Sequence, residues 1–525
     1  MNDYDVIVIG GGLNSLICAS MIGKSGKKVL LLESRKKIGG LASTEEFING
    51  FQCNLIYDYL NSIDSRMVNE LDLLSHGLSF HNSELKKIAL DQNQNHIYFH
   101  ENINKTVDSI KPHSLKDAKR WPLFLKQLQK SSIFLEKLYH ISAPDIRNIN
   151  YKEILSMKSL LSPLFKFGIK AFINFIRTSS MMMPEFMDQW FESKLLRGAV
   201  SSCSIHHLCH GPYAAATGFN LLHNNTFNNN VFHNSIFIKG GTQRLIESLK
   251  KSAKFNGVEI RINTKVVSIN VNNNSCSGVS INNNEILKSN CVVSGLDPRN
   301  TFLELIDSHE LNPSLIRQIK NIKFNGCVSR LHFVLKECPN ILNVAKEDLN
   351  TVFTIAPNIK YLEKASDATK YGAISDNPYI EFTIPSILHD NFSSNHHHVL
   401  SATVQYTPYQ LKSMRWDDKE KEKLKNNVIE TLDLYISNFK SIVDSCYVLS
   451  PLDIEKMFNL TEGNLNHGEM ILNQVLFMRP IMSSPKYYTP INKLYLCGPG
   501  THPGGGVHGA NGYNAAKELL KNEIF

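Results

Sequence analysis

Several patterns that define other classes of protein are scarce in this sequence or missing from it. The ten cysteines are scattered and form no Cys-x-x-Cys pair, which argues against dithiol chemistry of the thioredoxin or disulfide-reductase kind. Their spacing does not fit a secreted disulfide scaffold either. No Ser-His-Asp arrangement and no paired-carboxylate motif is recognisable in the sequence. The chemistry of hydrolases is therefore not indicated.

Charge and hydropathy exclude two further classes. Lysine and arginine number 56 against 48 aspartates and glutamates, so the net charge of +8 is modest, and no dense basic stripe indicates nucleic acid. No uninterrupted apolar run has the length needed to cross a membrane. The first expected strand starts at Asp5, which leaves no room ahead of it for a signal or transit peptide. We expect an intracellular protein, either cytoplasmic or in peripheral contact with a membrane.

The most informative stretch lies near the start of the chain. Residues Asp5–Ile9 are mostly apolar and β-branched, which predicts a buried strand. Gly10, Gly11 and Gly12 follow at once, and residues 13–22 are typical of a helix. A tight glycine turn between strand and helix directs free backbone N–H groups and the positive end of the helix dipole at one point. The sequence therefore predicts a pyrophosphate site above this turn.

The next strand supports a dinucleotide ligand. Lys28–Leu32 is the second expected strand, and Glu33 closes it about twenty residues after the glycines, where a carboxylate suits the ribose hydroxyls of an adenosine. Ser15 stands at the place of the third glycine of the usual fingerprint, and serine is small enough for the helix to lie close to the strand. Gly39 and Gly40 then allow the backbone to pass close to a ligand.

The C-terminal end carries a second glycine-dense element. Residues 493–500 predict a strand that runs into a turn, and residues 501–509 form a loop rich in glycine. Such a loop can lie with its backbone flat against a ring. Residues 510–520 predict a terminal helix, whose N-terminus would favour a ring that gains negative charge on reduction.

Two stretches leave alternatives open. The side chains that crowd together after residue 202 could bind a metal, but their spacing fits no common zinc site, so we predict no metal there; they are Cys203, His206, His207, Cys209 and His210. Residues 154–177 predict a helix with a broad apolar face and basic residues along one edge. This helix either packs into the core, or dips into a bilayer interface, or lines the mouth of an apolar tunnel.

In its glycine-rich and C-terminal motifs, and over nearly its whole length, the chain resembles the flavin-containing phytoene desaturase and carotenoid oxidoreductase family. The most specific motifs are Gln405-Tyr-Thr-Pro-Tyr, residues 461–468 (Thr-Glu-Gly-Asn-Leu-Asn-His-Gly), residues 474–480 and residues 494–509. The resemblance implies an α/β fold: a glutathione-reductase-like, FAD-binding Rossmann domain with a discontinuous α+β substrate domain. Ser15, and Leu41 at a position where related amine oxidases often carry arginine, depart from the family pattern.

The resemblance also implies where FAD is held. The turn, its helix and Glu33 would hold the ADP half, Gly39 and Gly40 would approach the phosphates or the ribityl chain, and Val266 would meet the adenine side through its backbone. Gly498 and the loop of residues 504–509 would cover the isoalloxazine. The full set of expected cofactor-binding residues is Gly10, Gly11, Gly12, Asn14, Ser15, Glu33, Ser34, Arg35, Gly39, Gly40, Val266, Gly498, Gly505, Gly506 and Val507.

The length of the chain predicts two or three domains, and the FAD-binding domain is expected to be discontinuous. Residues 1–60, 236–300 and 456–525 would form it. Residues 61–235 would form a mostly helical region that faces the substrate or a membrane, and residues 301–455 the sheet of the substrate domain. In that last part, residues 417–439 predict one long charged helix.

The resemblance implies an FAD-dependent oxidoreductase that desaturates an apolar, carotenoid-like or lipid-like substrate by hydride transfer to flavin N5. Oxygen or a quinone would accept the electrons, and no nucleic acid would bind. His502, His508 and His467 are the candidates for a proton relay. Two alternatives stay open: a reduced-flavin double-bond isomerase, and a non-catalytic flavin-bound interaction protein. If the protein is eukaryotic, the resemblance implies a location in mitochondria.

Overall fold

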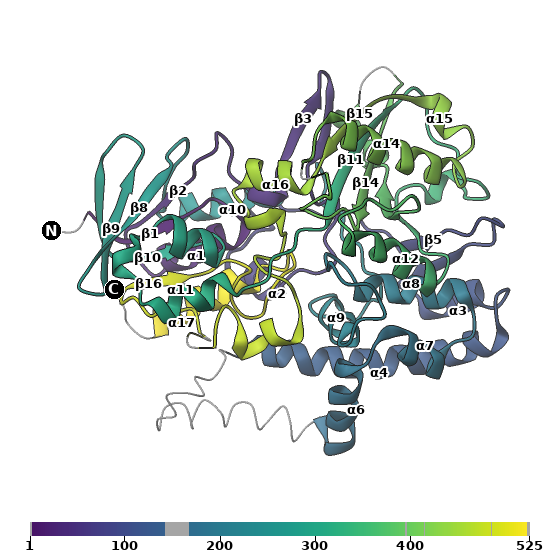
Figure 1. The fold of residues 1–525 in the computed structure, drawn as a ribbon, viewed down its shortest axis with the longest axis horizontal. Helices are drawn as coiled ribbons and strands as arrows, with labels where there is room; N and C mark the ends of the chain where they lie inside the picture. Colours follow the sequence, from purple (N-terminus) through teal and green to yellow (C-terminus); the bar gives the residue numbers. More distant parts are fainter. Residues whose placement is uncertain are drawn as a thin grey trace.

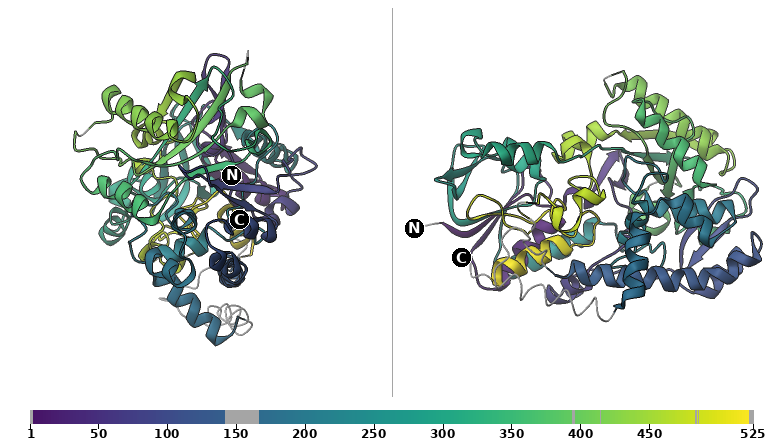
Figure 2. Two further views of the ribbon diagram at one scale, coloured as in Figure 1. Left: turned by 90° about the vertical axis from the view of Figure 1, so that its right-hand side faces the viewer. Right: turned by 60° about the horizontal axis from the view of Figure 1, so that its bottom comes forward.

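Two β-sheets lie side by side in the computed structural model, with helices around them (Figure 1). The structure describes residues 3–141, 167–393, 396–413, 415–482, 484 and 486–521. The first sheet contains both the N-terminal and the C-terminal strands. The second sheet stands beside it, and a layer of helices runs beneath (Figures 1 and 2).

The first sheet is mainly parallel and is assembled from three separated stretches of chain. Its parallel strands are, in spatial order, β7 (Glu259–Arg261), β2 (Val29–Leu32), β1 (Tyr4–Ile9), β10 (Ile286–Ser294) and β16 (Leu494–Leu496). The antiparallel strands β9 (Ser275–Ile281) and β8 (Val266–Asn272) continue from β10. The strands β1 and β2 are apolar without alternation because a parallel sheet is covered on both faces.

Helices cover one face of this sheet and put the glycine turn at its edge. They are α1 (Leu13–Lys24), α10 (Gln243–Phe255) and α17 (Ala510–Lys521). Val6 and Leu31 of the sheet pack with Leu16, Leu249 and Leu519 of these helices in one buried core. The opposite face packs on α11 (Pro313–Lys320) and on β8 and β9. The expected strand and helix at the start of the chain are therefore present.

The second sheet has a clear alternation of side chains. Its strands are, in spatial order, β15 (Val443–Leu449), β11 (Val328–Leu335), β14 (His398–Gln405), β13 (Tyr379–Thr383), β12 (Val352–Ile355), β5 (Leu85–Ala89) and β6 (Ile97–His100). One face is apolar and packs on α14 (Asp418–Asp433) and α15 (Phe439–Ile442). The other face presents polar side chains, and Thr403 among them is half-buried. The rest are buried: Arg330, His332, Thr354, Glu381, Thr383, Ser401 and Gln405.

The helical layer beneath is rich in aromatic side chains. It contains α3 (Ile103–Ile110), α4 (Leu115–Tyr139), α6 (Ile169–Ser180), α7 (Met183–Trp190), α8 (Lys194–Ser204) and α9 (Thr217–His223). Phe134 of α4 stacks on Phe167, with ring centroids 4.3 Å apart, and contacts Phe175 of α6 edge-on. The helix α6 projects from the body of the molecule below α4 (Figure 1). Among the described residues, no helix has the length and hydropathy to span a bilayer.

Smaller elements complete the described chain: the hairpin of β3 (Thr44–Ile48) and β4 (Phe51–Asn54), α2 (Ser65–Glu70), α12 (Ile359–Lys370), α13 (Pro385–Leu388) and α16 (Pro451–Phe458).

Two sequence-based expectations differ from the structure. The charged helix expected over residues 417–439 ends at Asp433, and the separate short helix α15 begins after Asn438, whose φ of 53° is left-handed. The helical region of residues 61–235 also supplies β5 and β6 to the second sheet, which the sequence reading missed. Most of the amphipathic helix expected at residues 154–177 lies outside the described residues.

Candidate functional site

The glycine turn after β1 leaves a helix N-terminus open. No side chain caps α1, and no acidic residue lies in its first turn, so the first backbone N–H groups of the helix are available to a ligand. Gly10 has a left-handed φ of 91°. Gly12 has an ordinary φ of −74°, and a Cβ atom built on it would meet no atom within 4 Å. The space above Gly12 is therefore room for a ligand.

Glu33 fixes the turn from the end of β2. Its carboxylate accepts hydrogen bonds from the backbone N–H groups of Gly11 (2.7 Å) and Arg35 (2.8 Å), and from the Ser34 hydroxyl (3.2 Å). The second glycine pair lies against this turn, because the Gly39 N–H donates to the Gly11 carbonyl at 2.8 Å. These contacts bring the two glycine segments together as one wall.

The serine that replaces the third glycine is accommodated by another glycine. A Cβ atom on Gly295, which follows β10, would lie only 1.9 Å from Ser15 Oγ. The missing side chain at Gly295 thus provides the room that Ser15 takes. Asn14 is tied to the C-terminal helix, since its Oδ1 accepts the Gly512 N–H at 3.1 Å. In this way α1 and α17, from opposite ends of the chain, are locked side by side.

A single cavity of about 910 Å³ runs from the glycine turn to the C-terminal loop, here called the cofactor cavity. The expected cofactor-binding residues that line it are Gly10, Gly11, Gly12, Asn14, Ser15, Glu33, Ser34, Arg35, Gly39, Gly40, Val266, Gly506 and Val507. Gly498 packs against Gly295 and His467 instead of lining it, and Gly505 lines a neighbouring cavity. Cavities of 300 to roughly 1,000 Å³ are typical of ligand sites.

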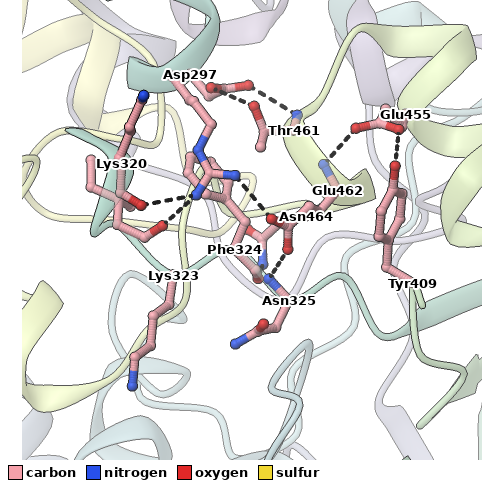
Figure 3. Close-up of polar contacts among 12 residues, drawn as sticks. Asp297, Lys320, Lys323, Phe324, Asn325, Tyr409, Glu455, Thr461, Glu462 and Asn464 are labelled. Carbon is pink, nitrogen blue, oxygen red and sulfur yellow. Dashed lines mark hydrogen bonds and ion pairs between the residues drawn. The ribbon is translucent and has the colours of Figure 1, made fainter. Parts of the chain in front are cut away.

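The motif of residues 461–468 lines the same cavity and is hydrogen-bonded to the segments around Glu455, Asp297 and Phe324 (Figure 3). Glu455 accepts the Glu462 N–H at 2.8 Å and the Tyr409 hydroxyl at 2.5 Å. Asp297 accepts the Thr461 N–H at 3.1 Å. Asn464 donates to the Phe324 carbonyl. These contacts give a structural reason for the residue pattern of the motif, because the motif connects the two sheets at the cavity wall.

Buried histidines support the C-terminal loop from behind. His223 of α9 donates from Nε2 to the Gly505 carbonyl (2.9 Å), and its Nδ1 accepts from the Tyr139 hydroxyl (2.7 Å). His508 bonds to the same carbonyl at 3.2 Å and accepts the Ala510 N–H at 3.1 Å. Burial lowers the pKa of His223 to about 3 and that of His508 to about 4. Both are therefore neutral near pH 7.

The three histidines expected to relay protons lie in different places. His508 lines the neighbouring cavity, but both its ring nitrogens are occupied by the backbone. His502 donates to the Leu138 carbonyl at 3.3 Å and lines neither cavity. His467 lines the cofactor cavity, and its buried Nδ1 has no partner among the described residues. A proton relay through them stays a prediction.

Arg479 is a buried cation that holds the loops at the end of the cavity next to the C-terminal loop. Its guanidinium donates to the carbonyls of Pro499 (2.8 Å) and Gly468 (3.0 Å), and also to those of Asn466, Glu469 and Gln474. Burial lowers the pKa of Arg479 to about 9. Arg479 therefore holds residues 466–474 and Pro499 together, a role that the motif of residues 474–480 did not reveal.

A smaller cavity of about 70 Å³ adjoins the cofactor cavity. Tyr57, Leu465, Gly506 and Val507 line both, so these residues form the boundary. The smaller cavity lies between the C-terminal loop and the polar face of the second sheet. Its lining includes His206 and Glu381, which are hydrogen-bonded at 2.8 Å. We call it the substrate cavity.

The structure explains the crowded cysteines and histidines after residue 202. His206 bonds to Glu381, and the His207 N–H donates to the Gln405 side chain at 2.9 Å. Among the described residues, no group of histidine, cysteine, aspartate or glutamate could hold a metal ion. All ten cysteines are free thiols. The alternation of polar residues in β11, β13 and β14 is a signal in the sequence that could have predicted the polar face of the second sheet, which forms the floor of the substrate cavity.

These features fit FAD. The uncapped helix N-terminus suits a diphosphate, the open space at Gly12 suits its close approach, and the unpartnered Nδ1 of His467 is a polar group that a ligand would satisfy. Fold and site together define an FAD-dependent oxidoreductase. The chain belongs to the flavin-containing amine oxidoreductase family, whose model matches residues 16–520.

Individual relatives cover nearly the whole chain. Pyridine nucleotide-disulfide oxidoreductase domain-containing protein 2 of Rattus norvegicus is 28% identical over 99% of this chain and 94% of its own length. One of the polypeptides of limonene dehydrogenase from Castellaniella defragrans is 25% identical over the same shares. A phytoene desaturase (lycopene-forming) of Pantoea ananas is 21% identical over 96% of each. The family resemblance seen in the sequence is thus confirmed.

The fold is also that of a solved oxidase. A redesigned putrescine oxidase superposes with a TM-score of 0.62, at 13% identity, over 99% of this chain and 98% of its own. This likeness is one of fold: an α/β FAD-binding arrangement with mixed sheets.

Proposed function

We propose that the protein dehydrogenates a small molecule whose reacting carbon lies in the substrate cavity. The observation that carries this proposal is the shared boundary of the two cavities at Tyr57, Gly506 and Val507. FAD held in the cofactor cavity would supply the oxidant, taking a hydride at its N5 atom. The residues of the chain would bind the cofactor at Gly10–Ser15, position the ring at Gly506 and Val507, and exclude bulk water from the reacting carbon.

The names of the relatives support an apolar skeleton for the substrate. One relative is named for limonene and one for phytoene, and both names denote dehydrogenation or desaturation. We therefore propose a carotenoid-like or lipid-like substrate, with oxygen or a quinone as the electron acceptor. We also propose that the chain follows the glutathione-reductase-like layout, with residues 1–60, 236–300 and 456–525 as the FAD-binding domain and residues 61–235 and 301–455 on the substrate side.

An apolar substrate would be delivered from a membrane surface, and we propose that α6 makes a peripheral contact with it. Ile169, Ile173 and Ile176 lie on one side of this helix with exposed fractions of 71%, 58% and 51%. Lys170 and Arg177 are exposed on the same helix. An apolar stripe flanked by cations is typical of helices that lie in a bilayer interface.

A vesicle assay tests the contact. Replacing the three isoleucines by serine should abolish flotation with vesicles of phosphatidylglycerol and phosphatidylcholine, whereas Leu74→Ser, at a site 57% exposed elsewhere on the surface, should not change it. Equal flotation of the triple variant and the native protein would contradict the membrane contact.

The function itself is tested by flavin reduction. Purified protein should take up FAD, and anaerobic incubation with fractionated native lipids should bleach the oxidised-flavin absorbance. Protein that takes up no FAD contradicts the proposal. A product of unchanged mass, formed only after the flavin has been reduced, would indicate the isomerase instead. Bound FAD that no extract reduces would indicate the non-catalytic protein.

A further inference from the structure

The floor of the substrate cavity is polar and contains a buried carboxylate. Glu381 on β13 is held by three donors: Lys87 Nζ at 2.5 Å from Oε1, His206 Nε2 at 2.8 Å from Oε2, and the Tyr59 hydroxyl at 3.0 Å from Oε2. The side chains of Lys87 and Glu381 are only 5% and 4% exposed. Tyr59, His206 and Glu381 line the cavity. A buried network of this kind is costly unless every group is satisfied.

The network fixes where the protons lie. Burial alone raises the pKa of a carboxyl group, but Lys87 and His206 together hold the pKa of Glu381 well below its usual range. An ionised carboxylate only accepts hydrogen bonds, so in neutral His206 the proton is on Nε2 and the lone pair is on Nδ1. Within the part of the chain that the structure describes, Nδ1 has no hydrogen-bond partner. In this tautomer Nδ1 offers a lone pair to a hydrogen-bond donor in the cavity.

The charges around the cavity cancel. Glu381 is paired with Lys87, and the second carboxylate of the lining, Asp58, is paired with Arg330 at 2.5 Å. A cationic substrate would therefore find no unpaired carboxylate among the described residues of this lining, and an anionic one no unpaired cation. A neutral group that donates a hydrogen bond fits the wall best. A hydrocarbon would offer no hydrogen bond to the free nitrogen of His206, whereas a hydroxyl would.

From this geometry we infer that the substrate carries a hydroxyl on the carbon that is oxidised, and that His206 accepts the hydroxyl proton. The inference rests on the proposed function and deepens it: the skeleton is apolar, and the reacting end is an alcohol. In the step, the O–H bond breaks and its proton goes to His206 Nδ1. The C–H bond breaks and its hydrogen leaves with the electron pair to the flavin, which is the oxidant. The C=O bond of an aldehyde or ketone forms. Glu381 positions His206 through its hydrogen bond to Nε2 and exchanges no proton or hydride with the substrate.

Matched pairs of compounds test the substrate class. FAD-loaded protein is mixed anaerobically with straight-chain primary alcohols from butanol to decanol, with geraniol and with perillyl alcohol, each beside its parent hydrocarbon. We expect at least one alcohol to bleach the flavin about tenfold faster than its hydrocarbon, or more. Loaded protein that no alcohol reduces, or that hydrocarbons reduce equally fast, overturns the inference. Failure to bind FAD would instead contradict the proposed function, so the two failures are distinguishable.

Variants of His206 test the proton acceptor. His206→Ala should slow flavin reduction by the best alcohol about a hundredfold or more, and added imidazole should restore part of the rate because it fits the vacated space. The FAD dissociation constant should not change. His206→Gln keeps a donor for Glu381 and should be equally slow without rescue, which guards against a folding defect of the alanine variant. His210→Ala is the control, since this residue is in the same loop, is 49% exposed and does not line the cavity. Native rates in both His206 variants would overturn the assignment.

Discussion

Gly12 shows that a glycine can be required by the ligand and not by the backbone. Its φ of −74° and ψ of 173° are open to any residue, and a Cβ atom there would contact nothing within 4 Å. Gly11 is the opposite case, because a Cβ atom there would lie 2.9 Å from Glu33 Oε2. A side chain at Gly12 would therefore affect only the ligand, whereas one at Gly11 would also disturb the folded chain.

Alanine at each of these positions makes a matched pair. Gly12→Ala should leave the free energy of unfolding within about 0.5 kcal/mol of the native value but weaken FAD binding on the order of tenfold, because the methyl group occupies the space of the diphosphate. Gly11→Ala should lower both the free energy of unfolding and the affinity for FAD. Urea unfolding of the FAD-free protein and FAD titration measure the two quantities. Unchanged FAD affinity in Gly12→Ala would contradict the placement of the diphosphate.

Arg479 provides a second contrast at the scale of one residue. Arg479→Met would remove the donor of four backbone carbonyls and one of the two donors of the Glu469 carbonyl. We expect a loss of about 3–5 kcal/mol in unfolding free energy, as for other buried charged networks that lose a partner. Arg479→Lys should recover part of the loss, because an ammonium satisfies fewer carbonyls in a different geometry. Urea unfolding compares the three proteins, and equal stability of Arg479→Met and the native protein would show that these hydrogen bonds are not needed.

At the scale of elements, the C-terminal loop depends on neutral histidines. His223, His502 and His508 are buried around it, and burial lowers the pKa of each to between about 3 and about 4. Their unfolded pKa is about 6.5. Between these values the unfolded chain binds protons that the folded chain does not, so stability that is present above pH 6.5 is lost as the pH falls.

Acid should therefore destabilise the protein through this loop. The free energy of unfolding should fall by on the order of 1.4 kcal/mol per pH unit for each such histidine between about pH 6 and pH 4. His502→Phe should reduce this slope, and its ring should be tolerated because the imidazole bonds to the Leu138 carbonyl over a long 3.3 Å and packs against Tyr139. Urea unfolding at several pH values measures the slope. An identical slope in the variant would contradict the assignment to His502.

The two sheets also show why parts of the molecule could be predicted from the sequence and others could not. Strand, turn and helix near Gly10 are contiguous in the chain, so local patterns were sufficient to predict β1 and α1, with a pyrophosphate site expected above the turn between them. The substrate cavity is different, since His206 and its partner Glu381 are 175 positions apart and meet only through the fold. The sequence reading therefore noticed His206 only as one of several crowded metal-ligand types. The pairing of Gly295 with Ser15 was hidden for the same reason.

At the scale of the whole molecule, FAD should join distant segments of the chain. The cofactor cavity is lined by the N-terminal turn, by residues 264–267, by the motif around Thr461 and by the C-terminal loop. A ligand that binds all of them stabilises the folded state by about 2.7 kcal/mol at a concentration of one hundred times its dissociation constant. A fragment of FAD that contacts only some of these segments should stabilise the folded state less.

A comparison of FAD with ADP tests this joining. FAD should raise the unfolding temperature of FAD-free protein, whereas ADP, which fits the glycine turn but does not reach Gly506 and Val507, should raise it less at the same multiple of the FAD dissociation constant. In Gly12→Ala both shifts should shrink. Equal shifts from ADP and FAD would mean that the ring end contributes nothing to binding.

The most direct test of the central claim is a crystal structure of the protein loaded with FAD. We predict the diphosphate over Gly11 and Gly12 at the N-terminus of α1, and the isoalloxazine ring at the boundary formed by Tyr57, Gly506 and Val507, with His206 on the far side of the substrate cavity. A ring placed away from that boundary, or a diphosphate bound elsewhere than at the glycine turn, would contradict the account.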